Sequence, residues 1–338
     1  MKHRKKHIPK PMATLGRVRG TGPLPQAVGG TRSVATQGLG ICIFLCLTFS
    51  CFTAQAQEKI WEGTACKANK VTLTEYLPEG EPWAAAVVCP GGSYHWLDLE
   101  AEGTRVGQWL AGEGIAAYVL QYRVAGKFEF AAKYRTFVRG NRYPDMLEDM
   151  QRAIQLVRER YNGPVGAMGF SAGGHLVMSS AEFFETNFLE RYGIEPEVSL
   201  KPDFVAPIYP VVTLSAQPVH KRSRLGLLGE WTVLKQEMRD SLSLEKHVRQ
   251  DTPPVFLLNC VDDPIVDYRN SELLDSALTA HKIPHVYTQY PTGGHGFGAS
   301  PEKQNEYTSQ WQEEFNKWLR IQILRCAQND KSCHPEEP

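Results

Sequence analysis

The residues best placed to do chemistry are the five at 169–173, which read Gly-Phe-Ser-Ala-Gly. A short apolar run, 164–168, precedes them, and a run compatible with a helix, 172–184, follows them. A strand, a sharp turn and a helix around G-x-S-x-G form the context in which the serine hydroxyl stands exposed as a nucleophile. Glycines on both sides of the turn let the strand and the helix approach closely. The sequence therefore predicts nucleophilic catalysis by Ser171, provided that the chain supplies its partners.

A serine hydroxyl needs a base to take its proton and an acid to orient that base. After a nucleophile on such a turn, the partners follow in the order Asp or Glu, then His. Asp263 follows an apolar strand-like run 92 residues after Ser171, and His295, flanked by glycines, follows another such run 32 residues later. We assign His295 as the base and Asp263 as the orienting acid, with the adjacent Asp262 as the competing candidate. His175, four residues after the serine, is expected to pack within its helix instead.

The negative charge that develops on an attacked carbonyl oxygen needs two fixed backbone donors. We expect one of them to be the N–H of Ala172, directly after the nucleophile. A glycine-rich loop after an early buried strand is expected to supply the other, at Gly92 or Ser93. The next three residues, Tyr94, His95 and Trp96, are expected to line the mouth of the substrate pocket.

Strand-like and helix-like segments alternate along the chain. Near-continuous apolar runs predict buried strands, and apolar residues at helical spacing predict the helices between them. This alternation predicts an α/β fold, with a mostly parallel central sheet and helices on both faces. Reactive loops then lie beyond the carboxyl ends of the strands, where all the candidates above are found. The expected strands are 71–77, 84–89, 115–122, 164–168, 203–212, 254–261 and 285–290, and the expected helices are 101–111, 143–161, 172–184, 271–281 and 304–320.

The remaining segments show no clear period. We expect 123–142, which is aromatic and basic, to loop over the surface, and 214–246 to form a cap or lid. Because no repeat or low-complexity linker divides the chain, residues 57–322 are expected to form one domain. The polar segment 323–338 is expected to be a disordered tail.

The first 56 residues have the architecture of a secretory signal. A long basic, Gly- and Pro-rich lead-in precedes an apolar run at 39–52 and an A-x-A cleavage pattern at 54–56. The apolar run is shorter than the ~20 residues that a membrane span needs. We expect cleavage after Ala56 and a secreted or periplasmic protein, with lipid attachment at Cys51 as the alternative. Because the lead-in is unusually long, Met12 is an alternative start.

Composition excludes several classes of partner. The 338 residues carry 37 basic and 37 acidic side chains, and this balance favours neither a nucleic-acid partner nor a polybasic membrane surface. The cysteines after the leader are spaced neither as a disulfide framework nor as zinc-ligand pairs. Cys89 and Cys260 each lie at the end of an apolar run and are expected to be small buried hydrophobes. We expect no metal and no cofactor.

Four segments together resemble the α/β-hydrolase superfamily. They are Pro-Gly-Gly-Ser-Tyr at 90–94, Gly-Phe-Ser-Ala-Gly-Gly-His at 169–175, Asp-Asp-Pro-Ile-Val at 262–266 and Gly-Gly-His-Gly-Phe-Gly at 293–298. Within the superfamily they are similar to bacterial secreted acetyl-esterases, the acetylxylan-esterase and feruloyl-esterase-like group, over about residues 70–320. Pro90 stands where the hormone-sensitive-lipase branch has a histidine. Two residues depart from the acetyl-esterase group: Ser93 replaces a usual glycine, and Asp267 stands where proline is common.

The resemblance implies a serine carboxylesterase that hydrolyses short acyl esters through an acyl-enzyme. It assigns the same site residues as above, and it implies acetylated plant polysaccharides or oligosaccharides, such as acetylated xylan, as substrates. A serine peptidase of the prolyl-peptidase type and a non-catalytic binding protein on the same scaffold are the alternatives. Aromatic side chains near the expected mouth fit stacking on sugar rings, and they are Tyr94, Trp96, Tyr134, Tyr143 and Trp231.

Overall fold

The computed structural model describes residues 56–131, 140–215 and 217–333, without the side chains of residue 129 and residues 324–333. The predicted signal segment up to residue 55, and Tyr134, lie outside the described residues. The described residues all fall within one unit of the chain, Thr53–Pro338. None of the described helices is both long and apolar enough to cross a membrane.

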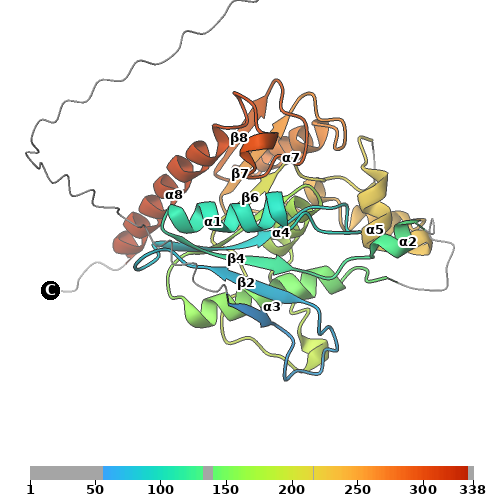
Figure 1. The fold of residues 1–338 in the computed structure, drawn as a ribbon, viewed down its shortest axis with the longest axis horizontal. Coiled ribbons are helices and arrows are strands. Elements are labelled where there is room, and N and C mark those ends of the chain that lie inside the picture. The colour runs from blue at the N-terminus through green and yellow to red at the C-terminus, as the bar shows by residue number, and fades with distance from the viewer. Residues whose placement is uncertain (1–55, 132–139, 216, 334–338) are drawn as a thin grey trace, which may run out of the picture. The chain divides into compact units, whose positions relative to one another are not determined.

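The described strands form a single eight-stranded sheet in the order β1-β2-β4-β3-β5-β6-β7-β8 (Figure 1). Strands β3 to β8 pair in parallel, whereas β1 and β2 at one edge pair antiparallel. Parallel pairing brings the carboxyl ends of β3, β5, β7 and β8 to one edge, where the candidate residues leave the sheet. The predicted α/β fold with a mostly parallel sheet is confirmed. The strands are β1 Gln57–Lys59, β2 Thr72–Tyr76, β3 Ala84–Cys89, β4 Ile115–Gln121, β5 Val165–Phe170, β6 Val205–Ile208, β7 Val255–Cys260 and β8 His285–Tyr290.

Apolar side chains fill two cores, one on each face of the sheet. Every residue of β3 and β5 is buried, because helices cover both faces. Helices α3, α4 and α7 contribute buried side chains to one core, and α1 and α8 contribute to the other (Figure 1). The helices are α1 Arg105–Gly112, α2 Lys127–Ala131, α3 Asp145–Arg160, α4 Ala172–Glu182, α5 Lys221–Thr232, α6 Gln236–Asp240, α7 Arg269–Ala280 and α8 Trp311–Cys333. Four short helical turns are η1 Glu100–Thr104, η2 Glu190–Tyr192, η3 Leu244–Lys246 and η4 Pro301–Lys303.

The last helix differs from its prediction at both ends. Helix α8 begins at Trp311 rather than at residue 304. Asn305 holds the intervening turn, since its side-chain oxygen accepts the N–H groups of Tyr307 and Thr308 at 3.0 and 2.9 Å. Such local side-chain bonds compete with helix formation. The backbone then stays helical to Cys333, beyond the predicted end at residue 320, and residues 334–338 of the predicted disordered tail lie outside the described part.

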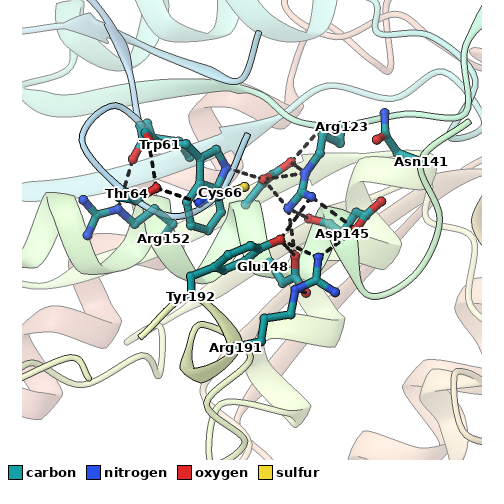
Figure 2. A network of polar contacts seen from close by, with 12 residues as sticks. Trp61, Thr64, Cys66, Arg123, Asn141, Asp145, Glu148, Arg152, Arg191 and Tyr192 are labelled. Carbon is teal, nitrogen blue, oxygen red and sulfur yellow. Dashed lines mark hydrogen bonds and ion pairs between the residues drawn. The ribbon is translucent and has the colours of Figure 1, made fainter. Parts of the chain in front are cut away.

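The segment after β4 begins with a buried ion network rather than a surface loop. The side chain of Arg123 is only 10% exposed, and its guanidinium donates to Asp149 and Glu148 of α3, each at 2.9 Å (Figure 2). Asp149 also accepts the indole N–H of Trp61 at 2.7 Å. Buried ion pairs are tolerated when such additional hydrogen bonds satisfy the charges. The network therefore fastens the segment around Trp61 and the end of β4 to α3.

Residues 214–246, expected as a lid, contain α5, α6 and η3. Helix α5 packs tightly on the glycine-rich loop after β3, because a Cβ on Gly226 would lie 2.5 Å from the carbonyl oxygen of Ser93. Helix α2 lies beside α5 (Figure 1), with the Arg222 guanidinium 5.4 Å from the centroid of the Phe130 ring. The two helices therefore cover the sheet edge where β3 ends.

Candidate active site

Ser171 lies at a strained turn between β5 and α4. Its φ of 54° and ψ of −116° fall in a region that residues other than glycine rarely adopt. The flanking glycines permit the turn, since a Cβ on Gly169 would lie 2.2 Å from the Gly173 carbonyl oxygen. A Cβ on Gly173 would likewise lie 2.0 Å from the carbonyl oxygen of Cys89. The turn holds the serine at the end of β5, with its N–H bonded to the carbonyl oxygen of Ile208 at 2.9 Å.

The structure brings the three predicted residues together at the ends of β5, β7 and β8. His295 Nε2 lies 2.9 Å from Ser171 Oγ, and His295 Nδ1 lies 2.6 Å from Asp263 Oδ2. When Nδ1 carries the proton and donates to Asp263, Nε2 accepts the serine hydroxyl. The side chains of Asp263 and His295 are 1% and 11% exposed, so little solvent competes for these bonds. This is the geometry of a base-activated nucleophile.

The two adjacent aspartates have different partners. Asp263 Oδ1 accepts the N–H groups of Ile265 and Val266 at 2.8 and 2.9 Å, which leaves Oδ2 facing His295. Asp262 Oδ1 instead accepts the N–H of Gly294 at 2.8 Å. Asp263 therefore contacts the imidazole, while Asp262 steadies the loop that carries it.

Residues 91–95, called the oxyanion loop after the role predicted for them, have an unusual backbone. Gly92, Ser93 and Tyr94 adopt positive φ values of 136°, 56° and 61°. His95 stabilises this turn, because its Nδ1 lies 2.8 Å from the carbonyl oxygen of Ser93. Within the described part of the chain, no acceptor takes up the N–H groups of Gly92, Ser93 or Ala172. These backbone donors are therefore available to a ligand.

His95 is buried, so the prediction that it lines the pocket mouth is wrong, and the same prediction is wrong for Tyr94. The side chain of Tyr94 is fully buried, because the positive φ turns the ring into the core. Its hydroxyl lies 2.9 Å from His175 Nδ1, and His175 Nε2 lies 2.9 Å from the carbonyl oxygen of Leu242. Burial lowers the pKa of His175 to about 4. His175 is thus packed within its helix, as predicted, and holds the segment after α6 against α4.

Trp96 is half-buried and forms a cluster with Phe130 and Arg222, here called the aromatic platform. The Trp96 and Phe130 ring centroids are 5.5 Å apart, and the Arg222 guanidinium lies 5.9 Å from the Trp96 ring. These distances are in the range of aromatic and cation–π contacts. Of the other aromatic candidates, Tyr143 packs against the core and Trp231 is 77% exposed on α5.

His220, directly before α5, was not predicted from the sequence. Its Nδ1 lies 2.8 Å from Ser223 Oγ. Burial, aided by the positive charges of His295 and Arg222, lowers the pKa of His220 to about 4, so the ring is neutral at neutral pH. These interactions place it near the base. No apolar period or turn signal marks this position in the sequence.

Comparison with known proteins gives the family. The family model described as BD-FAE matches residues 76–278, more than half of the chain. The chain belongs to the BD-FAE family. Among solved structures, it is similar to the acetyl ester-xyloside bifunctional hydrolase of Caldicellulosiruptor lactoaceticus, at 30% identity and a TM-score of 0.66. That match covers 79% of this chain and 96% of that chain.

Two curated relatives of this BD-FAE member are larger proteins. One is an acetylxylan esterase of Xylanibacter ruminicola, 28% identical over 262 residues, which cover 75% of this chain and 48% of the relative. The other is endo-1,4-beta-xylanase B of Butyrivibrio fibrisolvens, 31% identical over 231 residues, which cover 67% of this chain and 34% of the relative. The chain thus spans about half of the first relative and a third of the second. The comparisons place this family member among esterase-like α/β-hydrolases.

Proposed function

We propose that this BD-FAE member is a serine carboxylesterase that hydrolyses short acyl esters, above all acetyl esters, through an acyl-enzyme. The observation that carries the proposal is the hydrogen-bonded chain from Ser171 through His295 to Asp263. It lies at the carboxyl edge of the sheet, beside backbone N–H groups that are available to a ligand. A nucleophile, an oriented base and oxyanion donors are the parts that acyl transfer needs.

In acylation, Ser171 Oγ attacks the ester carbonyl carbon while its proton passes to His295 Nε2. The N–H groups of Ala172 and the oxyanion loop stabilise the charge on the carbonyl oxygen. When this intermediate collapses, His295 gives the proton to the departing alkoxide, and Ser171 keeps the acyl group. Water then attacks the acyl-enzyme with His295 as base, and the carboxylic acid leaves as the serine regains its proton. Asp263 holds the required tautomer throughout and stabilises the imidazolium.

For the substrate, we propose acetylated plant polysaccharides or their oligosaccharides. The relatives' names support this class, since they include an acetylxylan esterase and a xylanase. The aromatic platform supports it as well. Phe130 is 39% exposed next to the half-buried Trp96, and such apolar rings can pack against a sugar face. Arg222 adds hydrogen-bond donors for sugar hydroxyls at the same place.

A panel of 4-nitrophenyl esters from acetate to octanoate, assayed beside acetylated xylan, tests the proposal. We expect the highest kcat/KM for the acetate ester and release of acetate from the xylan. Cleavage of prolyl peptide substrates without hydrolysis of any ester would instead favour the peptidase alternative. A folded protein that cleaves neither kind of substrate would favour the non-catalytic one.

The platform is tested separately with Trp96→Ala. We expect KM for acetylated xylooligosaccharides to rise about 10-fold, the equivalent of one aromatic contact of about 1.4 kcal/mol. Hydrolysis of 4-nitrophenyl acetate, which carries no sugar ring, should change less. Trp231→Ala, an exposed α5 residue outside the platform, is the matched control and should leave both substrates unaffected. An equal loss on both substrates in Trp96→Ala would contradict a role in sugar binding.

A further inference from the structure

We propose that Glu102 is a positioning residue of this site, which joins the oxyanion loop to the loop of the base and places a second buried negative charge behind His295. The inference rests on the proposed serine hydrolase function and assigns a role to a carboxyl group that the acyl-transfer steps do not use. Glu102 lies in η1, a single π-helical turn before α1, and its side chain is 2% exposed.

One oxygen of Glu102 holds the oxyanion loop. The N–H of Gly91 donates to Glu102 Oε2 at 2.6 Å. A Cβ on Gly91 would lie 2.8 Å from that oxygen and 2.9 Å from the Cβ of Ser171. Gly91 is therefore clamped between the carboxyl group and the nucleophile, and the position of the loop depends on Glu102.

The other oxygen reaches the base through Tyr209. The Tyr209 hydroxyl donates to Glu102 Oε1 at 2.9 Å and accepts the N–H of Gly298, three residues after His295, at 3.1 Å. The centroid of the Tyr209 ring lies 4.6 Å from that of the His295 ring. Tyr209 itself is buried at a φ of 39°, a strained conformation that persists only where surrounding contacts fix it.

The backbone of η1 makes a second link to the loop of the base. The N–H of Ala299 donates to the carbonyl oxygen of Ala101 at 3.0 Å. A Cβ on Gly298 would lie 2.2 Å from the same oxygen, so the two segments touch directly. Through Glu102 and its neighbour, η1 therefore fixes the spacing between the oxyanion donors and the imidazole.

The hydrogen-bond directions favour an ionised Glu102. Both of its oxygens accept, one from Gly91 and the other from Tyr209, whose oxygen already accepts from Gly298. Burial raises the pKa of Glu102, and the positive charge of His295, the N–H of Gly91 and the hydroxyl of Tyr209 act against this rise. Asp98 adds to the rise.

This interaction is mutual: the positive charge of His295 favours the ionised form of Glu102, and ionised Glu102 favours the positively charged form of His295. The anion therefore stabilises the imidazolium that His295 becomes during acyl transfer. Besides Asp98 and Tyr209, the described titratable groups that act on this pair are Asp263, His220 and Tyr122. All three remain in a Glu102 variant, so a change in the pH profile of that variant reports the loss of the Glu102 charge.

The test is Glu102→Gln, which removes the charge. It also places the amide N–H₂ opposite a donor, either the N–H of Gly91 or the hydroxyl of Tyr209, so that one of the two hydrogen bonds is lost. We expect kcat to fall by up to about 100-fold with little change in KM, because the reacting groups lose alignment. We also expect the acid limb of kcat/KM against pH to move to lower pH by about half a unit to one unit. Glu100→Gln, on the same turn but with a side chain 68% exposed, is the matched control and should behave as wild type.

Tyr209→Phe keeps the ring against His295 but removes the hydroxyl link, and it carries the test if Glu102→Gln does not fold. We expect a similar fall in kcat, and the double variant should lose no more than the worse single variant. The inference would be overturned if kcat fell only in proportion to the fraction of unfolded protein while the pH profile stayed that of the wild type. It would also be overturned if the losses in kcat of the two single variants added up in the double variant. The pH dependence of Ser171 labelling by a fluorophosphonate gives the same readout without a substrate. If wild-type protein labels but hydrolyses no ester, the proposed ester substrate fails while the role of Glu102 is still measured.

Discussion

At the residue scale, nucleophilic attack by Ser171 depends on the position of one proton. His295 must carry it on Nδ1, so that Nε2 can accept the hydroxyl of Ser171 at 2.9 Å. The short contact between Nδ1 and Asp263 Oδ2, 2.6 Å, selects that tautomer. Asp262 directly precedes Asp263, but its Oδ1 accepts the N–H of Gly294 in the loop that carries His295. The two carboxylates should therefore differ sharply in their effect on the rate.

We predict that Asp263→Asn lowers kcat for 4-nitrophenyl acetate by about 10⁴-fold, because the amide favours the wrong tautomer of the base. Asp262→Asn should lower it by less than about 10-fold, since an amide oxygen can still accept the N–H of Gly294. Steady-state kinetics of the two purified variants, with melting curves to confirm folding, make the comparison. Equal losses in both variants would refute the assignment of Asp263.

At the element scale, α5 controls the shape of the oxyanion loop. Gly226 lets the helix approach until a Cβ would be 2.5 Å from the Ser93 carbonyl oxygen and 2.8 Å from the ring of His95. His95 in turn bonds to that carbonyl group. The available N–H groups of the loop are thus held from one side by η1 and from the other by α5.

We predict that Gly226→Ala lowers kcat about 10-fold or more and destabilises the fold by about 1–3 kcal/mol, because the added methyl displaces the loop. Gly112→Ala is the control, since a Cβ there meets nothing within 4 Å at the end of α1. The control should keep full activity and gain up to about 1 kcal/mol of stability. Kinetics and denaturant unfolding of both variants test this, and an active Gly226→Ala enzyme would count against control by α5.

The elements that the sequence predicted best are those with the strongest pattern. Strands β3 and β8 begin and end at the predicted residues, 84–89 and 285–290. In β3, continuous burial leaves a continuous apolar run, whereas the edge strand β8 has a single buried residue and is marked instead by its β-branched and aromatic residues. Strand β1 was missed because it has three residues and no buried side chain. Helix α5 was missed because its apolar residues follow no helical stripe across the kink at Gly229.

Within the site, the sequence predicted the residues that belong to recognisable local motifs. The order and flanking glycines of Ser171 and His295 singled them out, and the end of a buried strand singled out the aspartate pair. Glu102 and Tyr209 could not be found this way, because they are 107 residues apart and act only through their contact in the fold. Tyr94 was misplaced because a positive φ, which no local pattern marks, turns its side chain inward.

At the scale of the whole molecule, stability should depend on pH through buried histidines. Burial lowers the pKa of His95, His175 and His220 to about 4 each, against about 6.5 in an unfolded chain. The unfolded state therefore binds protons first as the pH falls. The stability that these groups contribute is complete above pH 6.5 and is lost as the pH falls toward 4. Burial raises the pKa of Glu102 and Glu182, which acts in the opposite direction, so single variants are needed to separate the contributions.

We predict that the wild-type free energy of unfolding falls between pH 7 and pH 5 by about 2 kcal/mol more than that of His175→Gln. The variant itself should be less stable at pH 7 by about 1–3 kcal/mol, because Tyr94 and Leu242 lose their partner. Urea unfolding at the two pH values measures both quantities. Parallel pH dependence in the two proteins would show that His175 does not titrate on unfolding.

The most direct test of the central claim is the site of covalent labelling by a fluorophosphonate, read by intact mass and peptide mapping. We predict a single adduct on Ser171 in the wild-type protein and none in Ser171→Ala. Labelling should be at least about 100-fold slower in His295→Ala, because the base is absent. An adduct that persists in Ser171→Ala, or a folded wild-type protein that takes up no label, would contradict the account.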